Sequence, residues 1–146
     1  MSDRNTGARE LFRSVLHAER ELRDVLAMRE HYLALATGGA GVTSVRRMRG
    51  NHHSRVESSA LALADLLDDL DERERTYAQL SRKADLLIAR LDKPHHRQVL
   101  RLRYLCGMNW EEIATRMDYS NVRSAYRTHG WALLEAERIM GARDAI

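Results

Sequence analysis

Apolar residues recur along this chain at alternating spacings of three and four, which is the pattern of amphipathic helices. In residues 8–36 the pattern has one interruption, because Arg29 occupies a position of the apolar seam. The seam residues are Leu11, Val15, Ala18, Leu22, Val25 and Tyr32. This coiled-coil-like repeat predicts one long helix over residues 8–36.

A second long helix is predicted over residues 54–91, where apolar residues recur every seven positions. These residues are Val56, Leu63, Leu70, Tyr77, Ala84 and Leu91. Two such helices can bury their seams against each other in a long antiparallel hairpin, or against a second chain as a dimerisation element. The sequence leaves both arrangements open, and we interpret residues 1–91 as a helical hairpin or oligomerisation region.

Residues 37–53 separate these two helices and show no apolar period. Four glycines make the segment flexible, and it carries Arg46, Arg47 and Arg49 without any acidic residue. Such a basic linker can either fold onto DNA as an arm or stay a solvated connector. Both interpretations remain open.

Residues 92–146 predict three shorter helices and form the second expected domain. Pro94 is suited to the first turn of a new helix. An apolar stripe at Val99, Leu102 and Leu105 follows, and Gly107 is expected to end it in a left-handed conformation. Asn109 and Glu112 have the spacing of a capping box, which predicts that the next helix begins after Asn109.

The turn after this second short helix is only Asp118–Tyr119–Ser120. Asp tolerates a positive φ, and Ser120 is expected to cap a third helix from about Asn121 onward. Two helices joined by so short a turn predict a helix-turn-helix unit over residues 92–146. Its expected core residues are Leu102, Leu105, Trp110, Ile113 and Ala114.

Composition supports an all-α fold, since the chain has one Pro and one Phe among 146 residues and few strand-forming residues. The net charge is only +3, but the charge is unevenly distributed. Residues 57–92 carry nine acidic and five basic residues, whereas residues 93–146 carry nine basic and six acidic ones. The basic excess therefore falls on the predicted helix-turn-helix, and the acidic helix before it is unsuited to lie on DNA.

Several classes of chemistry have little support in the sequence. Cys106 is the only cysteine, which excludes a disulfide within one chain. The histidine pairs at 52–53 and 95–96 are adjacent, so their rings diverge on a helix and do not predict a metal site. No phosphate-binding loop or nucleophile elbow is present, and we expect neither an enzyme nor a cofactor. Without a signal peptide or a long apolar run, we expect no membrane association and a cytoplasmic protein.

One stretch resembles a known family in its residue sequence as well as in its apolar pattern. Trp110–Ala114 reads WEEIA, Tyr119–Ser120 follows, and Tyr126–Leu133 reads YRTHGWAL. This run resembles region four of sigma-70-type factors. It is more similar still to small phage-encoded sigma-like regulators, the ArpU/RinA-like late transcription regulators. The resemblance covers roughly residues 91–137, and the stretch from Ser120 to Tyr126 is one residue longer than the family pattern.

The resemblance implies a phage-type transcriptional regulator that binds double-stranded DNA at a promoter, together with the RNA polymerase of a bacterial host cell. The N-terminal helices would then mediate homo-oligomerisation or docking to the polymerase. Two alternatives stay open. One is a DNA-packaging component similar to a small terminase, and the other is a helical interaction protein without DNA binding.

In a helix-turn-helix the second helix presents its N-terminal residues to the bases of the major groove. Arg123 is the predicted base-reading residue, because Arg forms bidentate hydrogen bonds with guanine. Asn121, Ser124 and Arg127 are expected to support it, and Ala125 and Thr128 are expected to face the core if the extra residue lies near Asn121. The remaining candidate DNA contacts are Ser120, Tyr126, Arg103 and Arg116.

Overall fold

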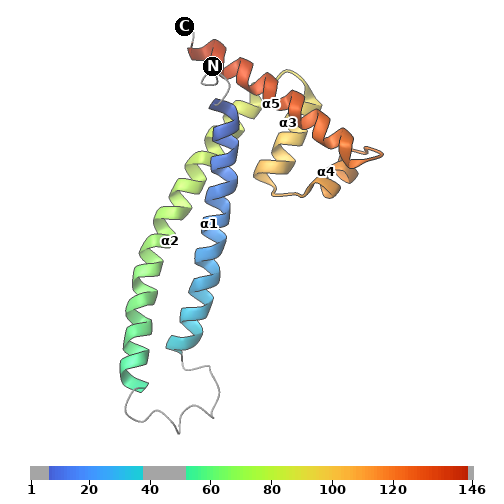
Figure 1. Cartoon of the computed structure of the whole chain (residues 1–146). Helices are drawn as coiled ribbons and strands as arrows, with labels where there is room; N and C mark the ends of the chain where they lie inside the picture. The colour runs from blue at the N-terminus through green and yellow to red at the C-terminus, as the bar shows by residue number, and fades with distance from the viewer. Residues whose placement is uncertain (1–6, 38–51, 145–146) are drawn as a thin grey trace. The chain divides into compact units, whose positions relative to one another are not determined.

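The computed structural model describes residues 7–37 and 52–144, and it shows an all-α protein without strands in that part of the chain (Figure 1). Its elements are α1 (Gly7–Ala36), α2 (His52–Ala89), α3 (Pro94–Leu100), a π-helical segment η2 (Arg101–Leu105), α4 (Trp110–Arg116) and α5 (Val122–Asp144). The two long helices predicted from the sequence agree with α1 and α2 within two residues at each end. The basic linker lies almost entirely outside the described residues.

The chain packs as two units. One consists of Met1–His17 and Tyr77–Ile146, and the other of Ala18–Thr76. We had divided the chain after residue 91, whereas the first packing unit joins the start of α1 and the end of α2 to the three C-terminal helices. Whether residues 92–146 fold independently stays a prediction.

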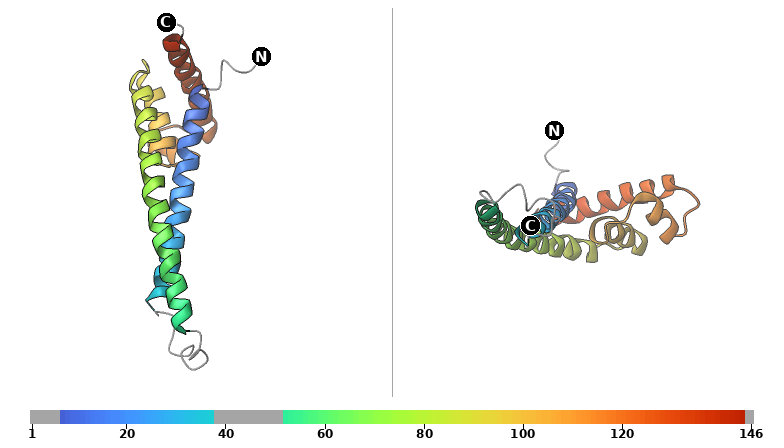
Figure 2. Two further views of the ribbon diagram at one scale, coloured as in Figure 1. Left: turned by 90° about the vertical axis from the view of Figure 1, so that its left-hand side faces the viewer. Right: turned by 90° about the horizontal axis from the view of Figure 1, so that it is seen from below.

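Within Ala18–Thr76, segments of α1 and α2 lie side by side (Figures 1 and 2). Val25 and Leu70 are buried there, in agreement with their seam positions. Across the pair, Arg73 Nη1 of α2 lies 2.6 Å from Glu21 Oε2 of α1. The ion pair is partly exposed, so apolar burial contributes more to this packing than the charges do.

The unit formed by Met1–His17 and Tyr77–Ile146 has a continuous apolar core. Its largest fully buried side chains come from several elements: Phe12 and Val15 of α1, Ile88 of α2, Leu91, Val99 and Leu100 around α3, and Ile113 of α4. Leu91 does not lie in α2 as expected, since this helix ends at Ala89 and Leu91 lies in the following turn. Its burial nevertheless secures that turn against the core.

None of the helices in residues 7–37 and 52–144 combines the length and the apolar character that a membrane span requires.

Candidate DNA-binding surface

The first element of the C-terminal region is a helix that widens toward its end. Pro94 lies at the start of α3, where a missing N–H costs no helical hydrogen bond. After Leu100 the chain continues as the wider π-helical segment η2. At its end the N–H of Cys106 donates to the carbonyl of Arg101, five residues back (2.9 Å). Gly107 then adopts φ 66°, a conformation that its missing side chain permits. The predicted stop at Gly107 is therefore confirmed.

The start of α4 is a complete capping box. The Asn109 side chain accepts a hydrogen bond from the N–H of Glu112 (2.8 Å), and Glu112 Oε2 accepts one from the N–H of Asn109 (3.0 Å). These two bonds satisfy backbone donors that the first helical turn leaves free. They confirm the predicted start of this helix and give the Glu112 carboxylate a structural role.

A tight turn follows α4 and contacts α5. Asp118 adopts φ 59°, as its residue type allowed us to expect, and the N–H of Tyr119 donates to the carbonyl of Ala114 (2.8 Å). The Tyr119 hydroxyl shares a hydrogen bond of 2.9 Å with the hydroxyl of Thr128 on α5. The turn is thus held from both sides, by α4 backbone and by an α5 side chain.

The predicted cap of the third helix was wrong by one residue. The first residue of α5 is Val122, and the side chain of Asn121 accepts hydrogen bonds from the N–H of Ser124 (2.9 Å) and from its hydroxyl (3.1 Å). Asn121, and not Ser120, therefore occupies the capping position. Both residue types cap helices well, so the sequence pattern alone did not distinguish them.

This helix start determines which α5 residues face outward. Arg123, Tyr126 and Arg127 are exposed, whereas Ala125 and Thr128 are buried, as expected for an extra residue near Asn121. Neither Arg123 nor Arg127 forms a hydrogen bond or ion pair with another described residue. The first two turns of α5 thus present two uncommitted guanidinium groups.

Two of the remaining candidates, Arg103 and Arg116, differ in their surroundings. Arg103 lies with its guanidinium carbon 4.7 Å from the centre of the Trp110 ring, and its Nη1 donates to the carbonyl of Met108 (3.1 Å). This geometry is a cation–π contact. Arg116 lies in the last turn of α4 and is exposed. Arg103 is therefore partly committed to packing, while Arg116 remains accessible.

Trp110 connects these elements, although it is only partly buried. We had expected Trp110 and Leu105 to be largely buried, and both are half-buried instead. The Trp110 ring packs against Tyr126 (4.5 Å between centroids) and edge-on against His129 (4.8 Å). Trp110 thus joins the start of α4 to the outward Tyr126 of α5, and part of its side chain remains accessible to solvent.

Tyr104 and His129 extend this aromatic contact into the core. The Tyr104 hydroxyl and His129 Nε2 share a hydrogen bond of 2.7 Å, and Phe12 of α1 stacks on Tyr104 at 4.8 Å. Burial lowers the pKa of His129 to about 4, with further contributions from the positive charges of Arg103 and Arg9. Burial likewise raises the pKa of Tyr104. Both groups are therefore neutral at neutral pH.

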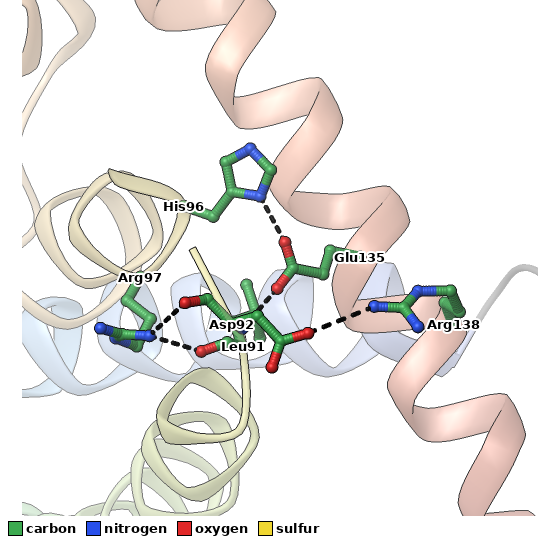
Figure 3. Close-up of polar contacts among 6 residues, drawn as sticks. All are labelled: Leu91, Asp92, His96, Arg97, Glu135 and Arg138. Carbon is green, nitrogen blue, oxygen red and sulfur yellow. Dashed lines mark hydrogen bonds and ion pairs between the residues drawn. The ribbon is translucent and has the colours of Figure 1, made fainter. Parts of the chain in front are cut away.

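A second polar cluster ties the turn before α3 to α5 (Figure 3). The buried Glu135 carboxylate accepts hydrogen bonds from His96 Nδ1 (2.6 Å) and from the backbone N–H of Asp92 (2.6 Å). Arg97 Nη1 donates to the carbonyls of Leu91 (2.6 Å) and Asp92 (3.0 Å) in the same turn. Together these bonds hold the turn that leads into the candidate DNA-binding helices.

The environment of Glu135 favours its ionised form. Burial by itself would raise the pKa of this carboxyl, but the hydrogen bonds from His96 and from the backbone of Asp92 and Lys93 outweigh burial and lower it. An ionised carboxylate has no proton to donate, so the Nδ1 atom of His96 is the donor. Sequence reasoning did not find this contact, because its partners are separated by 39 residues.

Arg9 and Glu137 form a similar long-range contact between α1 and α5. Arg9 Nε donates to Glu137 Oε1 at 3.1 Å, and the Glu137 side chain is almost fully buried. Its other oxygen, Oε2, is buried without a hydrogen-bond partner in the described part of the chain. This pair joins the start of α1 to α5 and also had no signal in the local sequence.

In residues 7–37 and 52–144, no three His, Cys, Asp or Glu side chains converge in a group that would hold a metal ion. Arg123, Tyr126 and Arg127 of α5 and Arg116 of α4 are exposed, whereas Ser124 is half-buried. Comparisons of this chain with protein-family models, with curated proteins and with solved structures found no match.

Proposed function

We propose that this protein is a sequence-specific DNA-binding transcriptional regulator of phage type, and that α4 and α5 are its helix-turn-helix. In this proposal α5 lies in the major groove, Arg123 reads a base edge, and Asn121, Ser124 and Arg127 support it. The protein acts at a promoter in the cytoplasm of a bacterial host, together with the host RNA polymerase.

The observation that carries the proposal is the pair of uncommitted arginines at the start of α5. Arg123 and Arg127 are four residues apart, so they share one side of the helix, and both are exposed. Arg side chains that are already held in ion pairs must break them before they bind DNA. These two have no such cost within the described residues.

The anchoring of α5 supports the proposal further. Its first turn is held by the Asn121 cap, and the preceding turn is held by the Tyr119–Thr128 hydrogen bond. A recognition helix must present its side chains in a defined register, because a rotation of 100° per residue would replace one contacting side chain by its neighbour. A rigid start of α5 provides that register.

We further propose that α1 and α2 form an antiparallel hairpin that mediates self-association. The burial of Val25 and Leu70 and the Glu21–Arg73 ion pair support pairing of the two helices. Operators that are read by helix-turn-helix proteins commonly contain two half-sites, so a dimer would place two copies of α5 on one DNA.

A binding titration tests the DNA-reading role of Arg123. Duplexes are first selected with the wild-type protein from a random DNA library, and the wild type and Arg123→Ala are then titrated against the selected and a scrambled duplex at several salt concentrations. We expect the substitution to cost about 1–3 kcal/mol on the selected duplex and to relax preference at one base pair. Arg20→Ala, which removes an exposed positive charge from α1, is the matched control.

Each result of this titration has a distinct meaning. Equal weakening on both duplexes, with a salt slope reduced by about one, would assign Arg123 to a phosphate and not to a base. Unchanged affinity of both Arg123→Ala and Arg127→Ala would remove α5 from the interface. Failure to select any duplex would overturn sequence-specific DNA binding altogether.

A further inference from the structure

An open groove of about 450 Å³ runs between the first turns of α1 and the last turns of α2. On the α1 side it is lined by Gly7, Glu10, Leu11 and Ser14. These residues have the spacing i, i+3, i+4 and i+7, which is the set that surrounds an inserted side chain when two helices pack knobs into holes. The groove is therefore shaped to receive side chains from a further helix.

The α2 side of the groove has the same spacing and a positive rim. Lys83, Leu86, Leu87 and Arg90 line it, and Leu86 is 59% exposed although Leu87 beside it is buried. Lys83 and Arg90 are exposed and have no ion-pair partner in the described part of the chain. Glu10 is the only acidic residue among those that line the groove. The charge of the groove therefore favours an acidic amphipathic helix.

The chain itself contains a segment with this chemistry, in the first half of α2. Ala60, Leu61, Ala64 and Leu67 are all exposed, and Leu61 is 66% exposed. Leu61 lies opposite the buried Leu70, nine residues on, whereas Leu67 lies beside Leu70, so these side chains extend outward from the edge of the buried seam. Their spacing of three and four gives the segment a partly exposed apolar side, with Leu67 46% exposed.

Acidic residues accompany this apolar side. Asp65 lies at the edge of this side and Asp68 lies within it, seven residues after Leu61. Both are exposed, and neither has an ion-pair partner among the described residues. The segment thus offers uncovered apolar side chains together with unpaired carboxylates. These are the two features that the groove with Lys83 and Arg90 requires.

We propose that the groove between α1 and α2 binds residues 60–68 of α2 from a second copy of the chain. The segment and the α2 wall of the groove belong to one continuous helix, which cannot fold back on itself, so they can meet only between two chains. This inference rests on the proposed self-association and is independent of DNA binding, because its residues are distinct from Arg123 and Arg127. It identifies the surfaces that join the copies.

Charge reversal on the full-length chain tests this contact, with the mass in solution followed by analytical ultracentrifugation. We expect Lys83→Glu with Arg90→Glu, and separately Asp65→Lys with Asp68→Lys, each to weaken self-association at least tenfold. All four changes in one chain should restore it, because the opposite charges then face each other again with exchanged signs. Arg116→Glu, on α4, is the control that should leave self-association unchanged. Circular dichroism verifies that every variant keeps its helical content.

The outcomes separate the two proposals. A wild type that stays monomeric at all concentrations would overturn both self-association and this contact. A wild-type oligomer that neither pair of substitutions weakens would leave self-association intact but assign it to another surface. If both pairs weaken it and their combination fails to restore it, the groove binds a different part of the second copy or a different acidic helix, and the assignment of residues 60–68 is wrong.

Discussion

The side of α5 that faces the core (the inward side) and the side that faces solvent (the outward side) carry different kinds of residue, although both kinds alternate along one helix. Small residues dominate the inward side, where Ala125, Ala132 and Ala136 are fully buried and allow α5 to pack closely against α3 and α4. The outward side carries Arg123 and Arg127, then Trp131 and Leu134, which are each more than half exposed. One side stabilises the fold, and the other is available for a partner.

The polar side chains on the two sides of α5 also differ in whether they have hydrogen-bond partners. On the inward side, Thr128 bonds Tyr119 and Glu135 bonds His96 and the backbone of Asp92. An unsatisfied buried polar group costs about 1–3 kcal/mol, and on α5 this applies to Glu137 Oε2, which has no partner among the described residues. The outward arginines have no partner among the described residues and need none, because water solvates them. An unpaired charge on α5 is therefore a property of its accessible side.

Adjacent leucines provide the strongest test of this comparison. Leu133 is 6% exposed and Leu134 is 52% exposed, so Leu133→Ala creates a cavity whereas Leu134→Ala mainly removes exposed surface. We expect Leu133→Ala to lower the free energy of unfolding by about 2–5 kcal/mol, and Leu134→Ala by less than about 0.5 kcal/mol. Chemical denaturation followed by circular dichroism measures both. Similar losses in the two variants would mean that the assigned orientation of α5 is wrong.

The pH dependence of stability tests the inward side through His129. Its pKa is lowered to about 4 in the folded protein, whereas in the unfolded chain it returns to about 6.5. Between these values the unfolded chain binds one more proton, so the free energy of unfolding falls as the pH decreases below about 6.5. We expect this group to remove about 1–2 kcal/mol by pH 4, less than the full shift implies, because His129 is only partly buried.

Comparison with His129→Gln isolates this contribution. The variant keeps a polar side chain near the Tyr104 hydroxyl but has no titrating group, so its stability should change less between pH 7 and about pH 4.5. Glu135 contributes in a lower window, since its pKa is below the ordinary value of 4.5 and its stabilisation is lost as the pH falls through that lowered value. Parallel pH profiles of wild type and variant would contradict the neutral state of His129.

Local sequence patterns predicted much of the structure of residues 92–146. They did not predict the contacts between residues that are far apart in the sequence. The Asn109–Glu112 capping box, the stop at Gly107 and the turn at Asp118 each depend on residues within a few positions, and all three are confirmed. The His96–Glu135 and Arg9–Glu137 contacts join residues 39 and 128 positions apart. No periodicity links such pairs, because their meeting depends on how whole helices pack.

The same limit applies to burial and to the candidate DNA contacts. Trp110 lies at a position of the apolar repeat, yet it is only half-buried. Its ring contacts the Arg103 guanidinium and the exposed Tyr126, and the apolar repeat does not predict either contact. The outward positions of Arg123 and Arg127 followed from helical spacing once the start of α5 was known. That these two arginines bind DNA stays a prediction.

The smallest expected effect concerns the residue that sets the register of α5. Asn121 accepts two hydrogen bonds from Ser124, whereas Ser120 is exposed and caps nothing. We expect Asn121→Ala to lower the free energy of unfolding by about 1 kcal/mol and Ser120→Ala to leave it unchanged within about 0.5 kcal/mol. Urea denaturation of the two variants side by side measures the difference. The reverse order would mean that α5 begins one residue earlier, and every α5 side chain would then have to be reassigned between the inward and outward sides.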